Sequence, residues 1–325
     1  MISVVMPAYN ASKFIAPAID SILNQTFQEF ELIIVDDGST DNTLEIVKSY
    51  LERDDRVQLI QSNHGGLSIA CNLGISNSKY SWIARMDADD IALPQRFEKQ
   101  INAARANPKV VAWGTYVHHM NSKGDVLSVN PLGPTSEEIF YNLRERGHVA
   151  HLHHPTVLLK KEIVLKAGGY NSEFEPAEDF ELFDRLANQG LLLAIPEPLL
   201  LYRVHSQSVS MQRFYHQKLL QRCVVARHRA RLAGNRELSI SEFLEEYKKQ
   251  PLVPGLKRYL HTLGQFYYRK AGLFACEQKY LQAGLHLSIS AALNPRYSIP
   301  RIWYQVLSPK TRRLLDKSNI SKNEE

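Results

Sequence analysis

Residues 31–39, Glu31-Leu32-Ile33-Ile34-Val35-Asp36-Asp37-Gly38-Ser39, form an apolar run that ends in two carboxylates and a glycine. A short, continuous run of branched apolar residues predicts a strand that is buried on both faces, as in a parallel sheet. Residues 2–6 and 82–86 are similar runs, and they lead into Pro7 and Asp87. The sequence therefore predicts three buried parallel strands with polar residues at their carboxyl ends.

Helical segments are expected between these strands, at residues 12–23, 41–51 and 66–76, with Asp41 or Asn42 as the N-cap of the second. Strands and helices that alternate in this way are typical of an open α/β sheet. In such a sheet, ligands bind outside the carboxyl ends of the strands. The acidic clusters that follow the strands all fall on that predicted edge.

Two groups of carboxylates suggest a chemistry for this edge. Asp87-Ala88-Asp89 follows the third strand, and the pair Glu178-Asp179 comes later in the chain. Carboxylate oxygens are the ligands that Mg²⁺ and Mn²⁺ prefer, and these ions bridge protein carboxylates to substrate phosphates. We interpret the first group as a site for a metal-bound diphosphate and the second as a candidate base. An isolated Asp-x-Asp triplet is usually a solvated turn, so this interpretation depends on the other motifs.

Further motifs follow one another in a fixed order along residues 1–210. They lie at residues 3–10, 35–43, 72–75, 93–97, 154–156, 168–170, 177–182 and 202–210. With the acidic triplet, this order resembles that of family 2 glycosyltransferases of the GT-A fold, of the type that builds bacterial polysaccharides and cell-surface glycans. The resemblance implies a Rossmann-like, mostly parallel sheet flanked by helices. It also implies a hexosyltransferase that uses a nucleotide sugar.

The resemblance places the nucleotide at the ends of the first two strands. Asp37 would accept a hydrogen bond from the uracil ring, because a carboxylate can bind the imide N–H that cytosine lacks. A UDP-sugar is therefore the favoured donor. The other residues implied for the base pocket are Pro7, Ala8, Tyr9 and Asn63. One position departs from the family pattern: Cys71 stands where Arg or Lys often precedes the Asn-x-Gly-Ile segment, so a positive contact to the nucleotide is expected to be missing.

The resemblance also implies a site for Mn²⁺ or Mg²⁺. Asp89 would be the direct ligand, Asp87 would lie near the ribose and the metal, and His205 would be a further ligand. A loop would close over the diphosphate and contribute Arg203, Ser208 and Ser210. A divalent ion stabilises the negative charge that builds up on the leaving diphosphate.

Transfer then requires no protein nucleophile. If Asp179 removes the proton from an acceptor hydroxyl while that oxygen attacks the opposite face of the sugar, one in-line displacement inverts the anomeric centre. Glu178 and His154 would bind the acceptor, which is expected to be a glycan or a lipid-linked oligosaccharide. Glu178 would also raise the basicity of Asp179 by like-charge proximity.

Each of these assignments has an alternative. Glu178 and Asp179 follow Pro176, and acidic residues favour a first helical turn, so they would cap a helix in a chain without the family motifs. A catalytically weak relative that binds a nucleotide or glycan is expected to have lost Asp89 or Asp179, yet both are present. A nucleotidyltransferase is expected to carry a Gly-rich, basic loop after its first strand, and residues 8–12 contain neither Gly nor a basic residue.

Composition sets the expected cell compartment. Three widely spaced cysteines fit a reducing cytoplasm rather than a disulfide framework. Met1 leads directly into a strand rather than a signal sequence, and the most apolar stretch, residues 190–202, is short and broken by prolines. We expect a cytoplasmic protein, either unattached or peripheral at the inner face of the plasma membrane.

A cluster of histidines could suggest a zinc site. The cluster of His148, His151, His153 and His154 matches no structural zinc pattern.

Charge divides the chain into two parts, which we expect to be a catalytic domain over residues 1–210 and a basic helical region over residues 211–325. The second part holds 21 of the 39 Lys and Arg and 8 of the 34 Asp and Glu, a net of +13, and the remaining 18 and 26 give the first part −8. Its expected helices cover residues 214–232, 241–249, 256–274 and 278–293, with breaks at Pro251, Pro254 and Pro295.

The basic region has two main interpretations. It is either a helical extension that packs on the catalytic domain, or a surface that binds an anionic membrane, since residues 267–270 and 300–304 mix basic and aromatic side chains. Residues 273–295 also faintly resemble one helical-hairpin repeat. Nucleic acid is not an expected partner, because no recognised binding motif is present.

Overall fold

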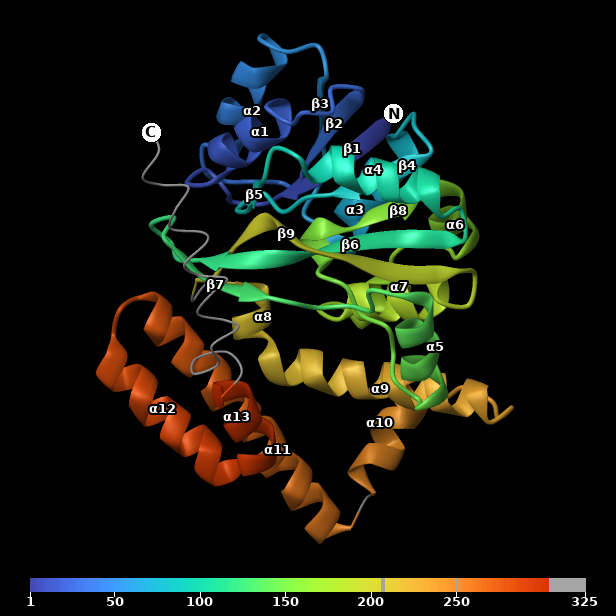
Figure 1. The fold of residues 1–325 in the computed structure, drawn as a ribbon, viewed down its shortest axis with the longest axis vertical. Helices are drawn as coiled ribbons and strands as arrows, with labels where there is room; N and C mark the ends of the chain where they lie inside the picture. The colour runs from blue at the N-terminus through green and yellow to red at the C-terminus, as the bar shows by residue number, and fades with distance from the viewer. Residues whose placement is uncertain (206–207, 250, 304–325) are drawn as a thin grey trace.

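The computed structural model describes residues 1–205, 208–249 and 251–303, except for the side chains of Val209 and Ser210. Within these residues, one mixed sheet of nine strands forms the centre, with order β3-β2-β1-β4-β8-β6-β9-β5 and with β7 paired to β6 (Figure 1). The strands are β1 (Ile2–Ala8), β2 (Phe30–Asp36), β3 (Val57–Gln61), β4 (Trp82–Arg85), β5 (Ile91–Ala92), β6 (Val110–Met120), β7 (Val126–Asn130), β8 (Leu158–Lys160) and β9 (Leu191–Arg203).

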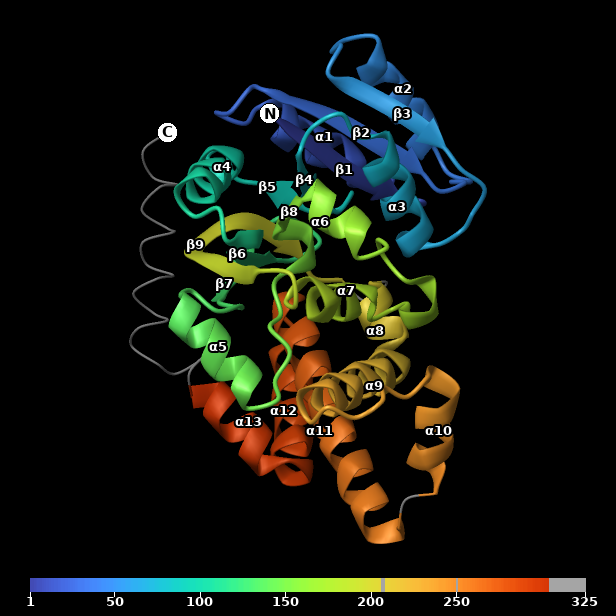
Figure 2. The same ribbon diagram turned by 90° about the vertical axis from the view of Figure 1, so that its right-hand side faces the viewer.

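Helices cover the sheet and then continue on one side of it, as Figures 1 and 2 show. In chain order, the helices are α1 (Ile15–Leu23), α2 (Thr43–Leu51), α3 (Leu67–Asn77), α4 (Arg96–Ala106), α5 (Glu137–Glu145), α6 (Lys161–Lys166), α7 (Glu178–Leu186), α8 (Val209–Gln212), α9 (Phe214–Leu232), α10 (Ile240–Lys248), α11 (Leu252–Cys276), α12 (Tyr280–Leu293) and α13 (Pro295–Ile302), with 3-10 turns at His154–Thr156 and Ser172–Phe174.

The three expected parallel strands are confirmed. β1 pairs in parallel with both β2 and β4, and β2 pairs in parallel with β3. Leu32 and Ile34 of β2 lie in the core cluster that contains α1, whereas Ile33 and Val35 pack with Ala70 of α3 on the other face. Burial on both faces explains why the run is apolar without alternation.

α1 begins at Ile15, three residues later than expected, and the segment before it is bound to the neighbouring loop. The N–H of Ala11 donates to Oγ1 of Thr43 at 2.8 Å, and the N–H of Ser12 donates to Oδ2 of Asp41 at 3.1 Å. The Asp41 carboxylate also accepts from the N–H of Thr43. These hydrogen bonds hold together the two loops at the carboxyl ends of β1 and β2.

The second half of the sheet was not anticipated from the sequence. β6 and β9 pair in parallel, while β8 runs antiparallel between β4 and β6. Residues 190–202, expected only as a short apolar stretch, form most of β9. Its prolines are accommodated where the β6–β9 register shifts, near Thr115 and Tyr116, since a proline cannot donate to a regular ladder. β9 ends at Arg203, beside the acidic loop.

The C-terminal helices follow the predicted pattern with one correction. Pro254 lies within α11 instead of breaking it. A proline in the first turn is tolerated, because the N–H that it lacks has no partner within the helix. Pro295 occupies the first position of α13 for the same reason. Tyr304 of the aromatic-basic segment lies outside the described residues.

Helix α9 joins the C-terminal helices to the rest of the molecule. Its Leu220, Cys223 and Val224 are buried in a cluster with Phe174 and Ala177. Nδ1 of the buried His228 lies 2.6 Å from Oδ1 of Asp184 on α7, a second link across the same contact. The division of the chain at residue 210 stays a proposal. Among the described helices, none is both long and apolar enough to cross a membrane.

Candidate active site

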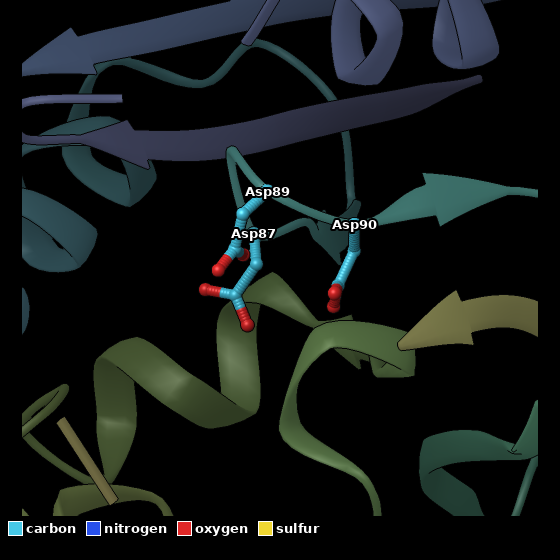
Figure 3. A group of neighbouring side chains, drawn as sticks. All are labelled: Asp87, Asp89 and Asp90. Atoms are coloured by element: carbon cyan, nitrogen blue, oxygen red, sulfur yellow. The ribbon is translucent and has the colours of Figure 1, made fainter. Parts of the chain in front are cut away.

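Three carboxylates converge in the loop between β4 and β5. Asp87, Asp89 and Asp90 each offer an oxygen atom within 4.8 Å of the others. Figure 3 shows the three side chains extending from the loop toward the same side. The loop starts at the carboxyl end of a parallel strand, as expected from the sequence. Like charges at this distance destabilise one another, so the loop requires nearby positive charge.

Asp90 is the third member of this group and was missed in the sequence analysis. Its side chain is 1% exposed, and the N–H of Arg203 donates to its Oδ1 at 2.8 Å. Its Oδ2 is buried and has no hydrogen-bond partner among the described residues. Burial raises the pKa of Asp90 well above its usual value, and the charges of Asp89 and Asp87 raise it further. Its position directly after Asp89 was the available signal.

Two buried arginines supply positive charge to the loop. Nη1 of Arg85, at the end of β4, lies 2.5 Å from Oδ1 of Asp87. The fully buried guanidinium of Arg96, on α4, donates to the backbone oxygen of Arg85 at 2.7 Å. Burial lowers the pKa of Arg96 to about 9, and the charge of Asp90 opposes that effect. A charged residue inside the apolar run 82–86 was the signal for Arg85.

Arg85 also bears on the position that departs from the family pattern. The Cys71 thiol is buried on α3, and burial raises its pKa to about 12, while the neighbouring charge of Arg85 lowers it. A positive group therefore lies beside Cys71, but β4 supplies it rather than α3. Arg85 pairs with Asp87, so its charge is already engaged within the protein. The expected lack of a positive contact to the nucleotide at this position stays a prediction.

The acidic loop fits a hard divalent cation. Its donors are carboxylate oxygens, and one of them, Oδ2 of Asp90, is buried without a partner in the described part of the chain. Nε2 of His205 lies 2.9 Å from Oδ2 of Asp89. The two side chains expected to bind the metal ion therefore lie next to each other. The roles of Asp87, Asp89 and His205 as ligands stay predictions.

Arg203 fixes the acidic loop through its backbone. Its Nε donates to the backbone oxygen of Asp89 at 2.7 Å, and its Nη1 donates to the backbone oxygen of Asn121 at 3.1 Å. The guanidinium also lies over the ring of Phe14, 4.5 Å from its centroid. The contact with a diphosphate expected for Arg203 stays a prediction, as does that for Ser208. The Ser210 side chain lies outside the described part of the chain.

Asp37 organises the loop that follows β3. It is 3% exposed, and its two oxygens accept from the N–H groups of Gly65 and Gly66 at 2.8 and 2.9 Å. Nδ1 of His64 lies 3.1 Å from Oδ2 of the same carboxylate. Each carboxylate oxygen can accept more than one hydrogen bond, so Asp37 keeps capacity for a ring N–H.

Next to Asp37, two aromatic rings lie against each other. Tyr9, at 47% exposure, stacks on His64 with ring centroids 4.1 Å apart. Pro7 and Ala8 form the buried end of β1, and Asn63 is exposed in the same loop as His64. The structure thus brings the expected base-pocket residues to one edge of the sheet, and His64 is an addition that the sequence analysis missed.

Glu178 and Asp179 form the start of α7, inside its first turn. Ala177, not an acidic residue, occupies the N-cap and makes no side-chain cap. Oδ1 of Asp179 accepts from the N–H of Phe180 at 2.7 Å, and its Oδ2 lies 4.0 Å from Nε2 of His151. The capping interpretation is thus satisfied only in part, since both residues follow the cap position.

The two acidic groups of the chain act on one another. Burial raises the pKa of Asp87, Arg85 lowers it, and the charges of Asp89 and Asp179 raise it again. A charge acts on a buried group over a longer range than it does in water, because the dielectric constant around it is low. The two acidic groups are therefore within range of one another's charge.

Glu178 differs from Asp179 in its surroundings. It is 4% exposed, and its Oε2 has no hydrogen-bond partner within the described ranges. Burial raises the pKa of Glu178 to about 8, with the charge of Asp179 as the second cause. Burial therefore favours the protonated form of Glu178 near neutral pH. The like-charge effect of Glu178 on Asp179 that was expected from the sequence stays a prediction.

His154 lies close to this pair through Tyr170. Its Nε2 is 2.8 Å from the Tyr170 hydroxyl, whose pKa is raised well above its usual value by burial. His151 is placed against Asp179, whereas His153 lies 3.0 Å from the backbone oxygen of Asn130. Within the described residues, these histidines form no metal-binding group. The acceptor-binding roles of His154 and Glu178 stay predictions.

Sequence comparison identifies the family of this chain. Residues 3–167 match the family described as Glycosyl transferase family 2. The chain belongs to this family. The O-antigen biosynthesis glycosyltransferase WbnJ of Escherichia coli is 37% identical over 214 residues, which are 64% of this chain and 81% of that protein. Chondroitin synthase of Pasteurella multocida is 28% identical over 58% of this chain and 19% of that protein. This family 2 member is therefore a glycosyltransferase.

Solved structures confirm the fold of this family 2 glycosyltransferase. TarS 1–349 of Staphylococcus aureus, in complex with UDP-GlcNAc, has a TM-score of 0.54 at 18% identity, over 90% of this chain and 91% of that chain. The mannosyltransferase PcManGT of Pyrobaculum calidifontis, in complex with GDP-Man and Mn²⁺, has a TM-score of 0.52 at 18% identity, over 98% and 79%. At this level of identity, the likeness extends to the fold alone.

The raised pKa of Glu178 predicts a dependence of stability on pH. The folded protein keeps a proton that the unfolded chain releases above the usual value of 4.5, so stability should fall as the pH rises from there to about 8. Glu178→Gln removes this group and should make the decline shallower. Urea unfolding from about pH 5 to about pH 8 measures it. Parallel declines in the two proteins would contradict the burial of Glu178 as an uncharged group.

Proposed function

We propose that the chain transfers a sugar from a nucleotide sugar, with a UDP-sugar favoured, to a hydroxyl of a glycan or lipid-linked acceptor, with inversion. The observation that carries this proposal is the electrostatic coupling between the acidic loop and the Glu178-Asp179 pair. The loop is suited to a metal-bound diphosphate, and the pair is suited to proton transfer. Their electrostatic interaction supports a leaving group and a base at one site.

The donor is assigned from the base pocket. Asp37 is held by the N–H groups of Gly65 and Gly66, so its oxygens have a fixed position from which to accept a ring N–H. Uracil provides such a donor and cytosine does not. TarS was solved with UDP-GlcNAc and PcManGT with GDP-Man, which supports a nucleotide sugar as the donor class.

A divalent ion, Mn²⁺ or Mg²⁺, would be held by Asp87 and Asp89, with Asp90 and His205 beside them. Such an ion would supply charge neutralisation to a leaving diphosphate. PcManGT was solved with Mn²⁺. In this chain, Arg203 holds the loop backbone and Arg85 orients Asp87. These contacts fix the carboxylates before any ligand arrives, so less reorganisation is required on binding.

Proton transfer is assigned to Asp179. Its side chain is 16% exposed, compared with the 4% of residue Glu178, and it can reach an acceptor hydroxyl that enters the site. The protonated Glu178 would donate a hydrogen bond to an acceptor oxygen. The raised pKa of Glu178 suits it to the role of a neutral donor beside a base. Attack opposite to the leaving group then inverts the sugar.

A panel of nucleotide sugars tests the donor class. UDP-sugars with Mn²⁺ should raise the melting temperature of the full chain, since a ligand that binds only the folded state adds about 2.7 kcal/mol at 100 times its Kd. CDP-sugars should leave the melting temperature unchanged. Stabilisation by GDP-sugars alone would replace UDP with GDP in the proposal. Stabilisation by no nucleotide would reject it.

The membrane-attached state of this enzyme is proposed to use the start of α11. Leu252, Val253 and Leu256 are 91%, 66% and 59% exposed there. Exposed Lys249 and Lys257 flank them. Both views place this turn at the end of the molecule opposite to β1–β3 (Figures 1 and 2). Apolar side chains flanked by lysines suit an anionic membrane surface.

Vesicle sedimentation tests this attachment. The full chain should sediment with vesicles rich in phosphatidylglycerol at low salt and be released as salt rises, because each basic residue near the surface adds about 1 kcal/mol. Leu252→Gln with Leu256→Gln should weaken sedimentation several-fold. Ile69→Gln with Leu165→Gln, at similarly exposed positions elsewhere, should not. Equal sedimentation of both double variants would favour a packing extension.

A further inference from the structure

The C-terminal helices carry positive charge without internal compensation. α9, α11, α12 and α13 contain no Asp or Glu. Two arginines of α9 are nevertheless neutralised from outside the helix: Arg227 pairs with Glu237, and Arg231 pairs with Glu237 and Asp184. Arg227 and Arg231 both lie in the C-terminal half of α9, so these ion pairs neutralise charge only in that half.

Lys218 and Arg222, one turn apart in α9, are different. In the part of the chain that the structure describes, neither forms a salt bridge with a carboxylate. Nζ of Lys218 donates to Oε1 of Gln221 at 2.9 Å. Arg222 donates to the hydroxyl of Tyr247 at 3.0 Å and to that of Thr262 at 2.6 Å. Neutral partners orient these two cations but leave their charge uncompensated.

The cations are close enough to act on one another. Burial and the charges of Arg269, Arg222 and Arg301 together lower the pKa of Lys218 to about 8. Lys218 and Arg269 both lie over the ring of Phe214, at 5.8 and 5.7 Å from its centroid. Like charges at this spacing destabilise one another, and an anion bound by Lys218 and Arg222 would relieve the repulsion between those two.

This cationic group adjoins the candidate base. Nε2 of Gln217, the neighbour of Lys218, donates to the backbone oxygen of Pro176 at 2.8 Å, directly before the turn that carries Asp179. The charge of Lys218 also acts on His151, which lies 4.0 Å from Asp179. The N-terminal half of α9 therefore connects the cations to the site of proton transfer.

We propose that Lys218 and Arg222 form a second anion site that binds a phosphate or diphosphate group of the acceptor beside Asp179. This inference rests on the proposed glycosyl transfer, because it assigns the acceptor to that same site. The acceptor would be a phosphorylated glycan or a sugar linked to a lipid through phosphate. Lysine and arginine are the usual partners of phosphate groups, and arginine can bind two oxygens at once.

Calorimetry with inorganic pyrophosphate tests the site in the full chain. EDTA is included so that no divalent ion can hold pyrophosphate at the acidic loop. Wild type should bind the probe, and Lys218→Gln with Arg222→Gln should weaken binding at least about 10-fold, since two charge-assisted contacts are lost. Lys218→Gln alone, which removes the contacts with Gln221 and the Phe214 ring but leaves those of Arg222, should weaken it several-fold. Lys48→Gln with Lys166→Gln, at exposed positions of equal charge, should leave it unchanged.

The outcomes separate this inference from the proposed function. Wild type and the Lys218 and Arg222 variants should bind UDP with Mn²⁺ equally well. If wild type does not bind UDP with Mn²⁺, the proposed function is rejected, whatever the result for the anion site. Unchanged pyrophosphate affinity in these variants, no binding to wild type, or equal loss in the Lys48 and Lys166 variant would overturn the anion site. Lower sedimentation with phosphatidylglycerol vesicles but unchanged pyrophosphate affinity would also overturn it, by assigning the cations to lipid headgroups.

Discussion

Asp179→Asn is expected to lower the rate of sugar transfer by about 10²-fold or more while leaving UDP affinity unchanged. The amide has the shape of the carboxylate but cannot accept a proton from the acceptor hydroxyl, so only general-base catalysis is lost. Among the described residues, Asp179 accepts a hydrogen bond from the N–H of Phe180, and the amide oxygen can accept it in the same way. Initial rates at saturating donor, with calorimetry of UDP binding in Mn²⁺, provide the measurement.

Glu173→Gln is the matched control for this variant. Glu173 is exposed shortly before the same turn, in the 3-10 helix Ser172–Phe174. Its substitution removes one negative charge without touching the proposed base, so the transfer rate should stay within about 2-fold of wild type. A near-normal rate in Asp179→Asn would show that another group takes the proton.

Asp89→Ala is expected to abolish the Mn²⁺-dependent part of UDP binding. The variant loses one of three converging carboxylates and the partner of His205. The remaining Asp87 is already paired with Arg85, so it cannot compensate for a missing ligand. Calorimetry with Mn²⁺ and with EDTA should give different UDP affinities for wild type and the same weak affinity for Asp89→Ala.

Asp55→Ala provides the control, because it removes an exposed carboxylate after α2. It should retain the full Mn²⁺ effect. Asp89→Ala should also keep a melting temperature close to that of wild type, since its side chain is 32% exposed and contributes little to the core. If both variants bound UDP with the same dependence on Mn²⁺, the acidic loop would not be the metal site.

The sequence predicted the parts of the fold that depend on local pattern. The apolar runs ending at Asp36 and Asp87 became parallel strands because burial on both faces requires continuous apolar residues. The helix over residues 214–232 was predicted at its observed bounds. The antiparallel strand β8 and the pairing of β6 with β9 were not predicted, since they join residues far apart in the chain and their pattern does not specify a partner.

The same distinction holds for the candidate site. Asp87, Asp89 and Asp179 were found because each stands in a motif with a definite chemistry. Arg85 was missed although it stands only two residues before Asp87, because the sequence alone does not show that its buried side chain turns toward that carboxylate. The protonation of Glu178 likewise depends on its burial, which only the packing of α7 determines.

The most direct test of the central claim is a proton NMR time course of nucleotide-sugar hydrolysis by the full chain. The donor is the UDP-sugar that stabilises the protein most, and water takes the place of the acceptor. With Mn²⁺, the sugar released first should have the anomeric configuration opposite to that of the donor, and with EDTA the release should stop. Release with the donor's own configuration, or at the same rate in EDTA, would contradict a metal-dependent, inverting transfer.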